Sequence, residues 1–148
     1  MEKRNLGNIG TKVGALGIGA MSFSDFYGPT NTQESHAILK LALDNGVDHI
    51  DTAKVYGMGL SEERIGQFLN TLSSKDRQFF KLATKGGIDR KNFDDKGTVV
   101  FDNSKKFLTE ELDNSLRRLG VDCVELYYVH RRETDRPIEE VTETLVGF

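Results

Sequence analysis

The sequence predicts an α/β fold with a parallel sheet, and three observations support this class. Four apolar runs begin near residues 13, 47, 79 and 121, at intervals of roughly 30–40 residues, which suits strands joined by crossover helices. The segments between them have apolar residues every three or four positions, as in amphipathic helices. The 148 residues are enough for one domain of four such units. A doubly wound sheet and part of a (β/α)8 barrel both fit this count.

The N-terminal segment is expected to form a β-hairpin that leads into the first strand. Two short runs flank the turn signal Asn8-Ile9-Gly10, and the strand follows at about 13–18. The first helix should begin at Asn31, because Asn31 and Glu34 have the spacing of a capping box. It should end at Gly46. Its predicted apolar stripe comprises Ala37, Ile38, Leu41 and Ala42.

The second unit repeats this pattern. Residues 47–50 are the expected strand, and Ser61 is expected to cap the following helix. Glu62 and Glu63 fall in the first turn, where they favour the helix dipole. The apolar stripe of this helix is Ile65, Phe68, Leu69 and Leu72.

The third and fourth units are less regular. Strands are expected at 79–84 and 121–129, and the helix between them should end at Gly120. That helix has a leucine stripe made of Leu108, Leu112, Leu116 and Leu119. Pro137 suits the first turn of a fourth helix, which ends with the chain. The long polar stretch 86–106 predicts a surface loop whose length indicates a binding function.

Composition excludes several classes of protein. A net charge of −3 without a basic run argues against nucleic-acid binding, and no apolar run approaches the roughly 18 residues of a membrane span. The N-terminus lacks the apolar core of a signal peptide. Cys123, the single cysteine, is expected to be a buried filler and suits the cytoplasm. No cysteine and histidine cluster has metal-ligand spacing.

Four polar residues stand at or after predicted strand ends: Asp51, Tyr56, Lys85 and His130. In a parallel barrel they would surround the C-terminal mouth, where active sites lie. Tyrosine, with an ordinary pKa near 10, is a poor acid at neutral pH unless a cation stabilises its phenolate. A lysine would do so, a carboxylate would orient that lysine, and an imidazole would donate a hydrogen bond to a carbonyl oxygen that gains charge.

Each of these residues also has a structural explanation. Asp51 suits a turn, Tyr56 suits packing beside Gly57, Lys85 suits solvent exposure, and His130 suits a basic strand end. The conjunction of all four at three successive strand ends favours the functional interpretation.

Six segments closely resemble the aldo-keto reductases, in that family's order and spacing. They are LGIGAM (16–21), DNGVDHIDTAKVYG (44–57), LSEERIG (60–66), LATKGG (82–87), SLRRLGVDCVELYYVHR (115–131) and PIEE (137–140). The run GAMSFSDFYGP (19–29) resembles the branch that includes voltage-gated potassium-channel β subunits. The resemblance covers essentially the whole chain.

This resemblance implies a (β/α)8 barrel entered through an N-terminal β-hairpin, and NADPH-dependent reduction of aldehydes and ketones without a metal. It implies Tyr56 as the general acid, Lys85 as the cation that favours its ionised form, Asp51 as the partner of Lys85, and His130 as the group that orients the substrate carbonyl. The implied cofactor-binding residues are Gly19, Ala20, Met21 and Asp51, the first three through backbone that lies against the nicotinamide ribose.

The sequence is short for such a barrel, which takes about 250 residues. We therefore expect residues 1–148 to be a single domain, the N-terminal half of a barrel that stops within the fourth helix. Strands five to eight are absent, and the family binds the cofactor phosphates there. Two functions remain open: an NADPH-dependent reductase of small-molecule carbonyls, or a non-catalytic, regulatory relative or half-barrel that acts only by association.

A half-barrel has a physical consequence for partners. Its first and fourth strands would be unpaired edges, able to recruit another chain, so self-association is expected. Its inward side chains would be uncovered. These are either Ile18, Ile50, Leu82 and Tyr128 or their neighbours on the other alternation.

Overall fold

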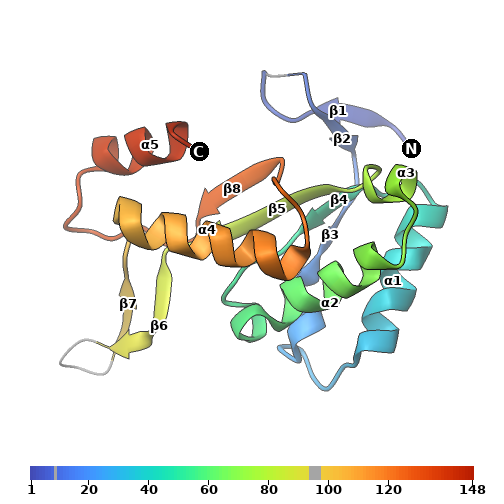
Figure 1. The fold of residues 1–148 in the computed structure, drawn as a ribbon, viewed down its shortest axis with the longest axis horizontal. Helices are drawn as coiled ribbons and strands as arrows, with labels where there is room; N and C mark the ends of the chain where they lie inside the picture. Colours follow the sequence, from blue (N-terminus) through green and yellow to red (C-terminus); the bar gives the residue numbers. More distant parts are fainter. Residues whose placement is uncertain (9, 94–97) are drawn as a thin grey trace.

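A four-stranded parallel sheet lies at the centre of the computed structural model, which describes residues 1–8, 10–93 and 98–148, without the side chains of 91–93 (Figure 1). Its strands are β3 (Gly17–Gly19), β4 (His49–Asp51), β5 (Lys81–Gly86) and β8 (Leu126–Val129). They lie side by side in chain order, all parallel. A doubly wound sheet reverses its strand order at a switch point, so the unbroken order favours a section of a barrel.

The long helices between these strands cover one face of the sheet. They are α1 (Thr32–Asp44), α2 (Leu60–Asn70) and α4 (Lys105–Leu119). Helix α1 packs against α2, and α2 packs against α4, so the helices follow the order of the strands. A doubly wound sheet would place them on both faces. The short α3 (Ser74–Arg77) precedes β5, and α5 (Ile138–Val146) follows β8.

The predicted N-terminal hairpin is present as β1 (Lys3–Asn5) and β2 (Lys12–Gly14), which pair antiparallel. Ile9, in its predicted turn, lies outside the described residues. The single strand predicted at 13–18 is divided between two sheets, because the Ala15 amide still bonds to Glu2 while Gly17 already pairs with His49.

Asp48 ties this hairpin to the central sheet. Its carboxylate, 4% exposed, pairs with Lys3 and accepts a hydrogen bond from the Gly14 amide at 2.6 Å. Burial alone would raise the pKa of Asp48, but the hydrogen bonds from Lys3 and Gly14 hold it below its ordinary value.

The hydrophobic core lies between the helices and the covered face of the sheet. Its fully buried members include Leu39, Ile50, Ile65, Leu69 and Leu119. Ile18, Ile50 and Leu82 are paired in register and all contact this core. They therefore face the helices, whereas Tyr128 pairs with Lys85 on the opposite, open face and is 40% exposed.

The capping box at Asn31 and Glu34 and the left-handed Gly46 are confirmed. The stripe predicted for α1 is correct only at Ala42, because this helix buries Ser35 and Leu39 beside it and leaves Ala37 exposed. Helix α2 packs against α1, while Ile38 and Leu41 lie on the solvent side of α1 and are exposed at 45% and 65%.

The cap predicted for α2 is also wrong. Gly59 occupies the N-cap, and Ser61 lies inside the helix. The Ser61 hydroxyl donates to the carbonyl of Ala20 and lies 2.8 Å from the Thr52 hydroxyl. It therefore joins α2 to the chain that leaves β3 and β4.

The stretch 86–106, predicted as a loop, contains the antiparallel strands β6 (Ile88–Phe93) and β7 (Val99–Phe101). The predicted strand 121–129 is shorter, since pairing with β5 involves only β8. Cys123 therefore lies in the connection before β8 and is exposed, which corrects its predicted burial. Within the described residues, none of the helices has the length and apolar character required to cross a bilayer.

Candidate active site

The predicted site residues converge at the C-terminal ends of the central strands. Asp51 ends β4, Lys85 is the penultimate residue of β5, and His130 follows β8 directly. Tyr56 opens the 3-10 helix η2 (Tyr56–Gly59) after β4. The turn needs Gly57, which has a φ of +62° and whose added Cβ would lie 2.8 Å from the Cβ of Ser24.

Lys85 is the centre of this arrangement. Its ammonium is paired with the Asp51 carboxylate, donates to the carbonyl of Thr52 at 2.9 Å, and lies 3.3 Å from the Tyr56 hydroxyl. The lysine side chain is 14% exposed. The predicted hydrogen-bond contact between Lys85 and Tyr56 is confirmed, while the chemical roles of the two residues stay predictions. Thr52 was not a candidate, because a backbone acceptor leaves no signal in the side-chain sequence.

His130 lies beside the tyrosine. The two rings are 5.7 Å apart between centroids and nearly perpendicular, at 87°. The backbone amide of His130 donates to the carbonyl of Gly86 at 2.8 Å, which extends the β5–β8 pairing to the histidine. Its buried Nδ1 has no hydrogen-bond partner in the described part of the chain.

The surroundings of His130 disfavour its charged form. Burial, followed by the positive charges of Lys85 and Arg131, lowers the pKa of His130, against the opposing effect of Asp51. These surroundings therefore favour the neutral imidazole. A neutral imidazole has one N–H donor and one acceptor, which suits it to donate a hydrogen bond to a carbonyl oxygen.

The predicted cofactor-binding residues differ in how accessible the structure leaves them. Gly19 ends β3 at the surface, and a Cβ added there would meet no atom within 4 Å, so the space beside it is open. Met21 is half-buried and lines the same cleft as Tyr56 and His130. Ala20 is fully buried, and its carbonyl accepts the Ser61 hydrogen bond. Open backbone at Gly19 and the half-buried carboxylate of Asp51 fit a hydroxylated group such as the ribose of a nicotinamide nucleotide.

A cleft of about 530 Å³ opens beside the converged residues. Tyr56 and His130 lie in it, and η1 (Ala20–Ser24), η2 and strands β6 and β7 contribute to its walls. Ile88, Arg90, Val99 and Phe101 of these two strands thus line the cleft, while the binding function expected for the stretch 86–106 stays a prediction. The arrangement combines a hydroxyl, an ammonium and a neutral imidazole in one place open to a small molecule.

A buried polar network supports the site from the helix side. Lys54, only 8% exposed, forms an ion pair with Glu111 of α4 at 3.1 Å. Glu62, fully buried, accepts hydrogen bonds from Thr84 at 2.6 Å and Arg118 at 2.7 Å. These contacts join the segment between Asp51 and Tyr56, and β5, to helices α2 and α4. The resemblance gave Lys54 no role, and its partner Glu111 is remote in the sequence.

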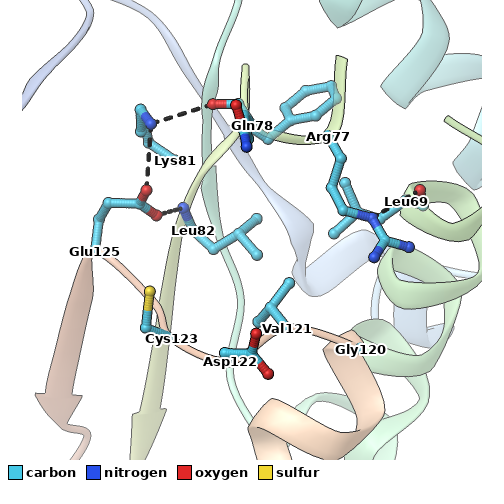
Figure 2. Close-up of a pocket in the computed structure, with 11 residues that line it drawn as sticks. Leu69, Arg77, Gln78, Lys81, Leu82, Gly120, Val121, Asp122, Cys123 and Glu125 are labelled. Atoms are coloured by element: carbon cyan, nitrogen blue, oxygen red, sulfur yellow. Dashed lines mark hydrogen bonds and ion pairs between the residues drawn. The ribbon is translucent and has the colours of Figure 1, made fainter. Parts of the chain in front are cut away.

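A second hollow, of about 360 Å³, lies at the opposite end of the sheet (Figure 2). Lys81 there bonds to Gln78 at 3.2 Å and pairs with Glu125 at 3.3 Å, and Glu125 also accepts from the Leu82 amide (Figure 2). Cys123 lies at its rim. Lys81 and Glu125 neutralise each other there, while Arg77 bonds to the Leu69 carbonyl and to Asn70.

Comparison with known proteins gives a consistent result. A family model described as "Aldo/keto reductase family" matches residues 15–148. A relative named aldo-keto reductase yakc [NADP(+)], from Schizosaccharomyces pombe, is 36% identical over 96% of this chain and 40% of the relative. A probable voltage-gated potassium channel subunit beta from Arabidopsis thaliana is 34% identical over 98% of this chain and 42% of the relative.

A solved structure agrees with these sequences. The aldo-keto reductase AKR11C1 from Bacillus halodurans, in its holo form, superimposes with a TM-score of 0.82 at 34% identity, over 99% of this chain and 46% of that chain. The chain therefore has the fold of a partial (β/α)8 barrel, as the resemblance implied. It spans about 40% of the length of the curated relatives named above.

Proposed function

Since the chain belongs to the aldo/keto reductase family, we propose that it provides the proton-donating half of an NADPH-dependent reductase of small-molecule aldehydes or ketones. The observation that carries this proposal is the ammonium of Lys85, held between the Asp51 carboxylate and the Tyr56 hydroxyl.

In the proposed reaction, the Tyr56 hydroxyl donates a proton to the carbonyl oxygen of the substrate. The phenolate that remains is stabilised by the ammonium of Lys85, 3.3 Å away. Asp51 keeps that ammonium in place, and the Thr52 carbonyl accepts another of its hydrogen bonds. Lys85, Asp51 and the Thr52 carbonyl thus stabilise the negative charge that forms on the Tyr56 oxygen as its proton leaves.

His130 has a different role in the proposal. Because its pKa is lowered, it binds the substrate oxygen as a neutral donor and does not compete with Tyr56 as the acid. Its ring lies across that of Tyr56, so both side chains reach the same region of the cleft. One carbonyl oxygen would then accept hydrogen bonds from both.

NADPH, when bound, would supply the hydride that reduces the carbonyl carbon. Gly19, Met21 and Asp51 would hold its nicotinamide end, because they lie beside open space at the same strand ends. The name of the Schizosaccharomyces pombe relative supports NADP over other cofactors. We place the reaction in the cytoplasm, in keeping with a single, unpaired cysteine.

The test uses a completed barrel, in which residues 1–148 are joined to the remaining units of a full-length relative. NADPH oxidation with a simple aromatic aldehyde should fall by roughly 10²–10⁴-fold in Tyr56→Phe, because the proton donor is lost. NADPH affinity, followed by fluorescence quenching, should stay the same. Tyr128→Phe is the matched control, because its ring also faces Lys85, at 6.0 Å, while its hydroxyl has no role in the proposal.

Near-normal turnover by Tyr56→Phe would show that another group is the acid. A completed barrel that binds NADPH but reduces no carbonyl would favour the rival function, a non-catalytic or regulatory chain.

A further inference from the structure

The cleft beside Tyr56 and His130 has an unbalanced charge. Arg90 and Arg131 both line it, and none of the described residues that line it is an aspartate or a glutamate. Asp51, at the adjoining strand end, is paired with Lys85. The two guanidinium groups therefore give the cleft a net positive charge.

Arg131 stands on a fixed backbone. Asn103, 1% exposed, donates its side-chain amide to the carbonyl of Arg131 at 3.1 Å and exchanges two hydrogen bonds with Glu133, at 2.8 and 2.7 Å. The Glu133 carboxylate also accepts from Arg136 at 2.8 Å. The acidic residue two positions after Arg131 is therefore engaged elsewhere, and the chain that follows His130 is held in one conformation.

Arg90 reaches the cleft from β6. Ile88 and Arg90 line the cleft, while Asp89 between them lines a separate hollow together with Lys54. This alternation is that of a strand with two different faces. After burial and Lys85, the charges of Arg131 and Arg90 both help to lower the pKa of His130, so both act on the imidazole proposed to bind the carbonyl.

The rest of the cleft wall is apolar. Phe26, Met58 and Phe101 line it and are exposed at 63%, 49% and 38%. Aromatic and thioether side chains favour contact with a flat or apolar molecular body. The cleft thus offers an apolar wall between two cations and a carbonyl-binding pair.

We propose that Arg90 and Arg131 select carbonyl substrates that carry a second, anionic group, a carboxylate or a phosphate, on an apolar body. This rests on the proposed function, because the carbonyl end is taken to bind at Tyr56 and His130. A guanidinium suits either anion, since its planar fork can donate two parallel hydrogen bonds to one oxyanion group.

Three probes share an aromatic aldehyde and differ in charge: 4-carboxybenzaldehyde, its neutral methyl ester, and 4-formylphenyl phosphate. Dissociation constants are measured by ligand-observed NMR on the completed barrel without cofactor, and kcat/KM on the same protein with NADPH. Both anionic probes should bind more tightly than the ester, and the preference should shrink with added salt because the cleft is open to solvent. The tighter of the two anions identifies the natural anionic group.

Arg131→Gln and Arg90→Gln should each reduce the preference for the acid over the ester by about fivefold or less, the worth of an ion pair that is open to solvent. The double variant should reduce it further, and the ester itself should bind equally to all variants. Arg132→Gln is the matched control, because this neighbouring arginine does not line the cleft; it lines only the adjoining hollow beside α5, which His130 and Arg131 also border.

An unchanged ratio in the double variant would overturn the inference, as would binding of neither anion to the completed barrel. So would weaker binding of NADP(+) with an unchanged ratio, because the arginines would then belong to the cofactor site. The proposed function fails separately, when the completed barrel reduces neither the ester nor the acid. Even then, the ratio of the dissociation constants of the acid and the ester still tests whether Arg90 and Arg131 bind the anion.

Discussion

The two faces of the central sheet differ in what covers them. On one face, Ile50 and Leu82 are buried under helices that the same chain provides. On the other, Asp51 and Lys85 are half-buried and Tyr128 is exposed, and within the described residues the edge strands β3 and β8 pair with no further strand. The covered face provides stability and the open face carries the reactive groups, so the two should respond differently to perturbation.

The largest expected effect concerns the open face as a whole. The 148-residue chain alone should self-associate and reduce no carbonyl at a measurable rate, because two free strand edges recruit further strands. Sedimentation and an NADPH-oxidation assay would measure this, with the completed barrel as the control. A cooperative, active monomer would contradict the expectation.

The covered face should be sensitive to lost volume. Ile50→Ala should lower the free energy of unfolding by about 2–5 kcal/mol, because Ile50 is fully buried and its removal leaves a cavity. Leu41→Ala on the exposed side of α1 is the control and should change stability by less than about 0.5 kcal/mol. Urea unfolding followed by circular dichroism compares the two, and equal losses would show that α1 packs differently.

The attachment of the hairpin should depend on pH. The lowered pKa of Asp48 means that its contribution is present above its ordinary value of 3.8 and is lost as the pH falls through the lower folded value. Asp48→Asn should lower the free energy of unfolding by about 1–3 kcal/mol at pH 7, since a buried, hydrogen-bonded carboxylate is removed. It should also make the free energy of unfolding depend less on pH below about pH 4.

Asp44→Asn is the control for this effect, because its pair with Lys40 is exposed. Thermal unfolding between pH 3 and pH 7 would show the difference. The same acid sensitivity in wild type and Asp48→Asn would assign it to another group.

The smallest effect concerns the charges around His130. Its NMR titration midpoint should lie below 6.5, and Lys85→Met should raise it because a nearby positive charge is removed. Asp51→Asn should lower it further, because the opposing negative charge is lost. Shifts of the same sign in the two variants would contradict this description of the site.

Motifs with local causes were predictable from the sequence. The capping box at Asn31 depends only on residues three apart, and Gly46 on its own backbone conformation. The four site residues were predictable because each follows an apolar strand run, and strand ends meet at one edge of a parallel sheet. The roles assigned to them still await the activity measurements.

Features that depend on distant partners were not predictable. The α1 stripe was placed wrongly because amphipathic spacing does not reveal which side a neighbour will cover, and Ser61 because its partners, Ala20 and Thr52, arrive from two other segments. Lys54 gave no signal for the same reason, since Glu111 stands on another helix.

By itself, the sequence determined the alternation of strands and helices, the family and the candidate reactive residues, because these follow from local periodicity and short motifs. Only the tertiary structure decided which sheet face is buried, that β6 and β7 pair with each other, and that Arg90 and Arg131 share a cleft with His130. Burial and charge at a point in space are sums over segments remote in the chain, and folding alone brings those segments together.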